Sequence, residues 1–115
     1  MTKTLTVVGG TYFEECLDPP SYVLSGSGLR GACALSGKGF QINYLSLLAK
    51  EDIGLAKTIC ASFGIEGKFQ EIGETIRFLY AHPLSLPFAY GINQPIIVKD
   101  IHAENILYYG LKETN

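Results

Sequence analysis

At 115 residues the chain has the length of one small domain, so we expect a single α/β domain spanning residues 1–115, with a core that needs no disulfide or metal. Nine basic and eleven acidic residues give a net charge of −2 without a basic cluster, which argues against nucleic acid as a partner. Hydrophobic residues make up 47% of the chain and charged residues only 17%, so we expect exposed apolar surface and self-association.

The cysteines and the hydropathy pattern predict a cellular location. Cys16, Cys33 and Cys60 are far apart and form no Cys-x-x-Cys pair, which indicates free thiols in a reducing compartment. We find no pattern typical of a secretion signal and no apolar run long enough to span a membrane. We therefore expect a cytoplasmic protein with neither a membrane nor a nucleic acid as its partner.

The first third of the chain predicts two strands, a loop and a helix. Residues 4–8 read Thr-Leu-Thr-Val-Val and stop at two glycines, which is typical of a buried strand entering a turn. The two consecutive prolines exclude regular strand pairing and predict a loop over residues 17–20. Residues 22–24 then predict a short strand, and the small and apolar residues that follow predict a helix over residues 29–36.

The middle of the chain predicts a second core strand and the clearest helix. Residues 42–48 are apolar at nearly every position, as in a parallel strand that is covered on both faces. Apolar residues then recur at helical spacing up to Phe63, with Glu51 or Asp52 placed to cap the helix start and Gly64 to end it. Strands that alternate with helices predict an α/β fold with a largely parallel core sheet and flanking helices.

The second half of the chain changes character. Residues 69–72 and 75–81 are joined by two residues and predict an antiparallel hairpin with one wetter face. Prolines and glycines predict an irregular loop over residues 82–95. We expect a helical turn over residues 101–105 and a final buried strand over residues 106–109.

The glycine-rich stretch from Gly26 to Gly39 is the main candidate for a binding site. Glycines ahead of a helix allow the backbone to approach a ligand closely, and the N–H groups of the first helical turn can face an oxygen-rich ligand. Arg30 lies in that turn, where a guanidinium can bind a phosphate or carboxylate with two hydrogen bonds. Close packing of a helix on a sheet explains the same small residues equally well, and a surface cation explains Arg30 equally well.

Other residues that could carry chemistry are sparse. Glu14 follows the first strand, near the end of the sheet where α/β proteins bind ligands, although a solvated loop carboxylate is the more common outcome. His82 and His102 flank the predicted loop and are more typical of surface histidines than of catalytic bases. Glu51 and Asp52 indicate a helix cap rather than a metal site, and we expect no bound metal.

Two segments carry a family resemblance. Residues 25–32 read Ser-Gly-Ser-Gly-Leu-Arg-Gly-Ala, with Gly39 closing the predicted helix, and residues 47–54 read Leu-Leu-Ala-Lys-Glu-Asp-Ile-Gly. They resemble the patterns Gly-Gly-x-x-x-Asn-x-Ala and Val-Gly-x-Asp-x-x-Gly of ribokinase-like (PfkB) carbohydrate kinases. The order of predicted elements is similar to the N-terminal, substrate-side portion of that family, in which an antiparallel lid covers the substrate.

The resemblance implies a sugar or nucleoside site where the first strand, the glycine-rich helix start and the lid converge. Glu14 stands where the family has an Asp that binds substrate hydroxyls, and Arg30 stands where the family has an Asn that contacts the substrate. The remaining residues implied at the site belong to the sugar-contacting turn or to the lid, and they are Gly26, Ser27, Gly28, Phe78 and Tyr80. In the family the lid strands often form a dimer interface, so the resemblance also implies a homodimer through these strands or an exposed sheet edge.

The resemblance implies ATP and magnesium as cofactors of the full-length family and none for this chain, because the family's catalytic Gly-Ala-Gly-Asp pattern does not occur here. We therefore expect part of a sugar-kinase-like protein, lacking the C-terminal ATP-binding half, that binds a sugar, nucleoside or phosphorylated small molecule but does not transfer phosphate alone. The alternative is a non-catalytic, dimerising interaction or regulatory module built on the same fold.

Overall fold

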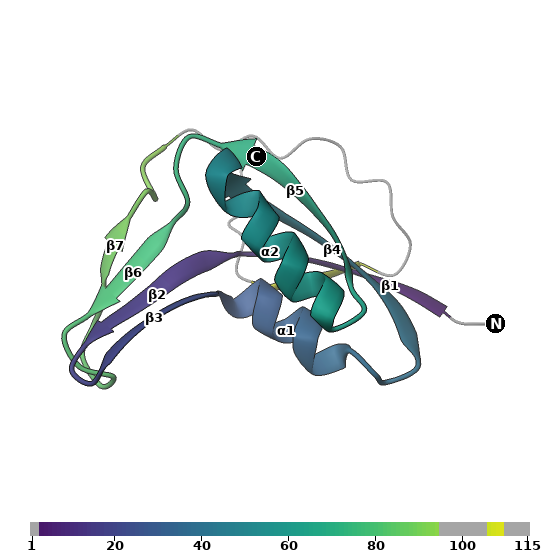
Figure 1. Ribbon diagram of the computed structural model, residues 1–115, viewed down its shortest axis with the longest axis horizontal. Helices are drawn as coiled ribbons and strands as arrows, with labels where there is room; N and C mark the ends of the chain where they lie inside the picture. The colour runs from purple at the N-terminus through teal and green to yellow at the C-terminus, as the bar shows by residue number, and fades with distance from the viewer. Residues whose placement is uncertain (1–2, 95–105, 110–115) are drawn as a thin grey trace.

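The computed structural model of the chain describes residues 3–94 and 106–109, which form two sheets and two helices (Figure 1). The core sheet has the strand order β5-β4-β1-β8 and is parallel throughout. Its strands are β1 (Lys3–Gly9), β4 (Phe40–Ala49), β5 (Glu66–Ile72) and β8 (Ile106–Tyr109). The outer sheet has the order β3-β2-β6-β7. Its strands are β2 (Tyr12–Leu17), β3 (Pro20–Ser25), β6 (Arg77–Tyr80) and β7 (Phe88–Tyr90).

Both helices pack on the same face of the core sheet. Helix α1 (Ser27–Leu35) and helix α2 (Lys50–Ser62) lie side by side in front of β4 and β1 in Figure 1. One buried cluster joins them to the sheet and contains Val7, Leu29, Ala32, Ile42, Tyr44, Cys60 and Ile65. The expected strands over residues 4–8 and 42–48 and the parallel α/β core are thereby confirmed. Burial of these apolar side chains is the main force that holds the helices on the sheet.

The outer sheet begins with a tight β-hairpin that the sequence analysis missed. Residues 17–20 were expected to form a loop, but Leu17 pairs with Pro20 and the antiparallel strands β2 and β3 continue from that pair. Pro20 is tolerated because it is the first residue of β3, and β3 is an edge strand of its sheet. The hairpin stands between β1 and α1, so the first half of the chain is not a simple strand and helix alternation.

The prediction of an antiparallel hairpin over residues 69–81 is wrong, although both predicted strands exist. Strand β5 pairs in parallel with β4 in the core sheet, and β6 pairs in parallel with β2 in the outer sheet. Helix α2 is the crossover that places β5 parallel to β4 in the core sheet. The segment after β5 then crosses to the outer sheet, where β6 pairs with β2. The antiparallel element is supplied instead by β2 with β3 and by β6 with β7.

Helix α2 differs from its expected boundaries at the start. Neither Glu51 nor Asp52 caps it, because the N-cap residue is Ala49, and the Ala49 N–H donates to the Thr75 hydroxyl at 3.0 Å. Phe63 was expected to face inward but is half-exposed just beyond the helix end. Gly64 ends the helix as predicted, with a φ of 70° that favours glycine.

The last predicted elements are partly testable. The predicted loop over residues 82–95 contains β7 in its described part, which pairs with β6. The strand over residues 106–109 is confirmed as β8 and pairs in parallel with β1, while the helical turn predicted over residues 101–105 and His102 lie outside the described residues. Within the described part of the chain, no helix is long and apolar enough to cross a membrane.

Candidate functional site

The glycines at the start of α1 are required by close packing against the end of β1. A Cβ atom on Gly26, whose φ is 105°, would lie 2.5 Å from the Gly10 carbonyl oxygen. A Cβ atom on Gly28 would lie 2.6 Å from Gly9 Cα and 2.5 Å from the Tyr44 hydroxyl. These separations are far below a van der Waals contact, so the backbone here accepts glycine alone. The packing explanation is therefore well supported for Gly26 and Gly28.

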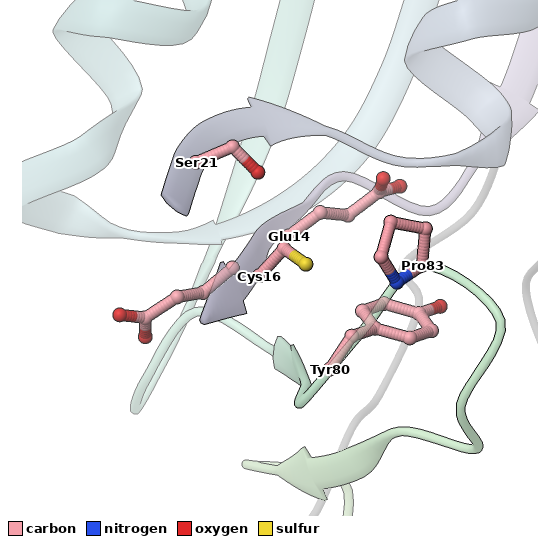
Figure 2. A pocket seen from close by; sticks show the side chains of 6 residues that line it. Glu14, Cys16, Ser21, Tyr80 and Pro83 are labelled. Carbon is pink, nitrogen blue, oxygen red and sulfur yellow. The ribbon is translucent and has the colours of Figure 1, made fainter. Parts of the chain in front are cut away.

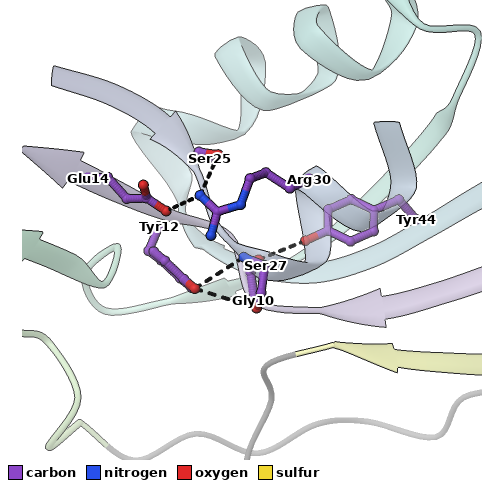
Figure 3. Close-up of polar contacts among 7 residues, drawn as sticks. All are labelled: Gly10, Tyr12, Glu14, Ser25, Ser27, Arg30 and Tyr44. Carbon is purple, nitrogen blue, oxygen red and sulfur yellow. Dashed lines mark hydrogen bonds and ion pairs between the residues drawn. The ribbon is translucent and has the colours of Figure 1, made fainter. Parts of the chain in front are cut away.

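Two backbone donors at the start of α1 are already engaged within the chain. The Gly28 N–H donates to the Gly10 carbonyl oxygen at 3.1 Å. The Ser27 N–H donates to the Tyr12 hydroxyl at 3.1 Å (Figure 3). An anion at this helix start would have to displace those partners. Ligand contact by Gly26, Ser27 and Gly28 therefore stays a prediction.

A buried polar network lies beneath the same turn. Thr11 Oγ1 donates to Ser46 Oγ at 2.7 Å, and Ser46 Oγ donates to the Gly9 carbonyl oxygen at 2.6 Å. The Tyr44 hydroxyl lies 2.7 Å from Thr11 Oγ1 and 3.0 Å from the Gly10 carbonyl oxygen. No buried side-chain nitrogen or oxygen among the described residues lacks a partner. The network fixes the chain where it leaves the core sheet for the outer sheet.

This network was missed by the sequence analysis, although it left a signal. Tyr44 and Ser46 are polar residues two apart in an apolar strand, so they face the same side of β4. Both are buried, and burial raises the pKa of the Tyr44 hydroxyl to about 12. Tyr44 is therefore a neutral structural hydroxyl at ordinary pH.

Arg30 and Glu14 form an ion pair above this junction. Arg30 Nη1 donates to Glu14 Oε1 at 2.6 Å and to Ser25 Oγ at 3.4 Å (Figure 3). The Arg30 side chain is 57% exposed and that of Glu14 is 24% exposed. Glu14 lies in strand β2 rather than in a loop. Its negative charge offsets the positive charge of the Arg30 guanidinium. The pair as a whole is neutral, which lowers the attraction of Arg30 for an anion.

Three predicted site residues share one face of the outer sheet. Glu14 pairs directly with Phe78, and Cys16, two residues further along β2, pairs with Tyr80. Side chains of directly paired residues lie on the same face of a sheet, as do residues two apart in one strand. The Tyr12 ring contacts the Phe78 ring edge-on, with 4.7 Å between their centroids. We call the side of the outer sheet that carries Tyr12, Glu14, Cys16, Phe78 and Tyr80 the Glu14 face.

A cavity of about 330 Å³ opens on the outer sheet, at its hairpin end (Figure 2). It has the volume of a small-molecule site. Glu14 and Tyr80 are the two predicted site residues that line it, and the full lining is Glu14, Glu15, Cys16, Ser21, Tyr80 and Pro83. Cys16 and Ser21 were not expected at a site, since nothing in the sequence indicated that residues 17–20 form a turn between paired strands.

The other reactive groups of the described residues are the cysteines and His82, and they show no second site within that part of the chain. Cys16, Cys33 and Cys60 are free thiols, as predicted. Burial raises the pKa of Cys33 and raises that of Cys60 to about 11, which makes both thiols poor nucleophiles. His82 Nδ1 accepts the Leu84 N–H at 3.2 Å within a surface turn. No group of metal-binding side chains occurs among residues 3–94 and 106–109.

Comparison with known proteins places this arrangement in a fold family. No family model matches the sequence, and no curated protein matches it either. The solved structures that match this chain include three with TM-scores of 0.59, 0.60 and 0.64. A sulfate complex of a pyrophosphate-dependent kinase in the ribokinase family matches 82% of this chain and 35% of its own, at 18% identity and a TM-score of 0.64.

Two further structures support the same assignment. A pyrophosphate-dependent kinase in the ribokinase family, complexed with a pyrophosphate analog and myo-inositol, matches 66% of this chain and 28% of its own at 17% identity, with a TM-score of 0.60. A microbiome-derived acarbose kinase matches 87% of this chain and 40% of its own at 16% identity, with a TM-score of 0.59.

The chain therefore has a ribokinase-like fold, which confirms the fold that the two sequence motifs implied. It spans about a third of the length of the kinases it matches. At identities below a fifth, the likeness establishes the fold and leaves the activity to be argued from the site.

Proposed function

We propose that the chain is the substrate-binding portion of a carbohydrate kinase. The observation that carries this proposal is the Glu14 face, where a carboxylate lies beside the Arg30 guanidinium and two aromatic rings. A carboxylate accepts hydrogen bonds from sugar hydroxyls, a guanidinium donates to them, and aromatic rings bury the apolar face of a sugar ring. The fold neighbours that act on inositol and acarbose support a polyhydroxylated ligand.

The charge of the site favours a neutral ligand among the classes considered. Arg30 by itself would favour a phosphorylated compound, but its 2.6 Å contact with Glu14 places an opposite charge directly against it. A diol can use the remaining N–H groups of Arg30 and the second oxygen of Glu14 without disturbing either charge. A neutral sugar, polyol or nucleoside is therefore proposed ahead of a sugar phosphate.

Phosphoryl transfer requires charge stabilisation around the γ-phosphate and a correctly placed base. The family's Gly-Ala-Gly-Asp pattern does not occur in these 115 residues. We therefore propose that transfer from ATP with magnesium occurs only when a further catalytic portion is supplied, and that substrate binding is the role of this chain.

A calorimetric ligand panel tests the proposal. Ribose, myo-inositol, adenosine and ribose 5-phosphate are titrated into the wild type and into the variants Glu14→Gln and Arg30→Asn. We expect a neutral ligand to bind and each variant to weaken it by about tenfold or more, because a buried ligand hydroxyl loses its partner. Arg77→Asn is the matched control, since Arg77 pairs with Glu15 on the opposite face and should leave affinity unchanged. Binding that is indifferent to both site variants would exclude this site.

A second proposal concerns self-association, which the exposed apolar residues of the outer sheet favour. On the face opposite Glu14, the side chains of Leu17, Tyr22 and Phe88 are 57%, 57% and 67% exposed. We propose that two copies pack these faces together as a homodimer. Large exposed apolar side chains on one sheet face are typical of an interaction surface. This surface would also serve the alternative role of a regulatory module.

Sedimentation at several protein concentrations tests the dimer. We expect a concentration-dependent dimer that Tyr22→Lys converts to a monomer, because a charge would be buried in the interface. Val23→Lys places the same charge on the Glu14 face of the same strand and should leave the dimer intact. A wild type that is monomeric at all concentrations would contradict the proposal, whereas a dimer that binds none of the ligands would favour the regulatory module.

A further inference from the structure

The cavity at the hairpin end of the outer sheet shares Glu14 with the site of the proposed function and extends from it toward the turn between β2 and β3. We infer that it is a second subsite, which holds the distal ring or aglycone of a neutral glycoside whose first ring binds at Glu14. This inference rests on the proposed sugar binding. It narrows the substrate class from any sugar or nucleoside to a glycoside longer than one ring.

Arg30 determines on which side of Glu14 a ligand can extend. Its guanidinium bridges Glu14 and Ser25, and Ser25 pairs with Tyr12, one row nearer the core sheet than Glu14. The space beside the Glu14 carboxylate on the core side is thus occupied. The cavity includes Glu14 but not Arg30, so open space adjoins Glu14 on the side of the hairpin turn. A ligand anchored at Glu14 extends in that direction.

The floor of the cavity is one row of the outer sheet. Cys16 pairs with Ser21 of β3 on one side and with Tyr80 of β6 on the other. This row is two residues along β2 from Glu14, which corresponds to about 7 Å. Figure 2 shows Cys16, Tyr80 and Pro83 grouped around the opening, with Pro83 coming from the turn after β6. A single ring bound at Glu14 leaves this row uncovered, and a second ring covers it.

The chemistry of the lining selects a neutral group. No Lys or Arg lines the cavity, and its two charged residues, Glu14 and Glu15, are both acidic. Both carboxylates are paired with arginines outside the cavity, Glu14 with Arg30 and Glu15 with Arg77, so the lining offers a phosphate no net positive charge, while a carboxylate oxygen still accepts hydrogen bonds from hydroxyls. The Ser21 hydroxyl adds a donor and acceptor, and the Tyr80 ring offers a surface for the apolar face of a second ring. The subsite therefore fits a hydroxyl-rich neutral ring or an apolar aglycone.

The Cys16 thiol reports directly on occupancy of this subsite. Alkylation of Cys16 by iodoacetamide is followed by peptide mass spectrometry. Cys33 lies outside the cavity and serves as the internal reference, which reacts more slowly because burial raises its pKa. Glucose is compared with maltose, cellobiose, trehalose and sucrose. We expect at least one disaccharide at ten times its Kd to slow Cys16 alkylation by about tenfold, and glucose to slow it much less. The Cys33 rate should not change.

A pair of variants on strand β6 provides the second readout. Tyr80→Ala removes the ring from the cavity, while Leu79→Ala removes a side chain from the opposite face of the same strand. We expect Tyr80→Ala to weaken disaccharide binding by about tenfold more than it weakens glucose binding, and Leu79→Ala to change neither affinity.

The outcomes separate the inference from the proposed function. If glucose or inositol binds in a Glu14-dependent way but no disaccharide protects Cys16, the second subsite is disproved and the proposed function stands. If a disaccharide protects Cys16 and its affinity depends on Tyr80, both are supported. If no neutral carbohydrate binds, both are overturned.

Discussion

The two sheets of this protein differ in how completely their side chains are buried. In the core sheet, Val7, Ile42 and Tyr44 are essentially inaccessible to solvent, and parallel pairing and two helices hold them there. In the outer sheet, every residue of β6 is partly buried, and strand β3 exposes Tyr22 and Val23. Substitutions in the core sheet therefore cost packing energy, while the outer sheet can change its side chains and hence its ligand at little cost in stability.

The largest expected effect is at the junction of α1 with β1. Gly28→Ala places a methyl group 2.5 Å from the Tyr44 hydroxyl and 2.6 Å from Gly9, so the helix start must shift. We expect the free energy of unfolding to fall by about 3 kcal/mol or more in urea denaturation. Gly54→Ala in α2 is the control, since its new methyl group meets nothing within 4 Å. That variant should gain up to about 1 kcal/mol, and equal destabilisation of both would refute the packing argument.

The next effect is an alkaline loss of stability through Tyr44. Its pKa is raised from 10 to about 12 by burial, so its stabilising contribution is complete below pH 10 and is lost as the pH rises toward 12. We expect this group to cost roughly 2–3 kcal/mol across that interval, measured by chemical denaturation at each pH. Tyr44→Phe cannot ionise and should show a shallower decline between pH 10 and 12. Parallel curves for the two proteins would contradict the assignment.

A smaller effect is expected where the chain crosses from the core sheet to the outer sheet. Thr75 accepts the Ala49 N–H at the start of α2 and donates to Asp52 Oδ2 at 2.5 Å, so its hydroxyl joins the first turn of the helix to the segment after β5. We expect Thr75→Val to lower the free energy of unfolding by about 1 kcal/mol. Thr75→Ser keeps the hydroxyl and should keep the wild-type value. Thr58→Val, on the exposed side of α2, is the control and should change stability by less. If Thr75→Ser did not retain the wild-type stability, the hydroxyl bridge would not be the source of the effect.

The smallest stability effect should come from the outer sheet. Arg30→Asn removes an ion pair whose guanidinium is more than half exposed, so water and salt screen it. We expect a change of less than about 1 kcal/mol in urea denaturation. The same substitution is expected to weaken ligand binding by about tenfold or more, which separates function from stability on this sheet. A loss of stability as large as that of Gly28→Ala would show that Arg30 is needed for folding rather than for binding.

Local pattern predicted the elements of the fold far better than their partners. The apolar run in β4, the helical spacing in α2 and the glycine after it each depend on neighbours in sequence, and all three were correct. The β2–β3 hairpin was missed because two prolines argue against strands unless the edge position is known. The pairings of β5 and β6 were wrong since strand alternation carries no information about which strand lies alongside.

The candidate site divides in the same way. The sequence by itself made Glu14 and Arg30 candidate site residues, and the motifs over residues 25–32 and 47–54 implied the ribokinase-like fold. Only the tertiary structure decided that these charges neutralise each other, that Gly26 and Gly28 serve packing, and that a cavity opens beside Cys16. The physical reason is range, because helix and strand preferences act over a few residues, whereas pairing, charge compensation and cavities depend on groups brought together from distant parts of the chain.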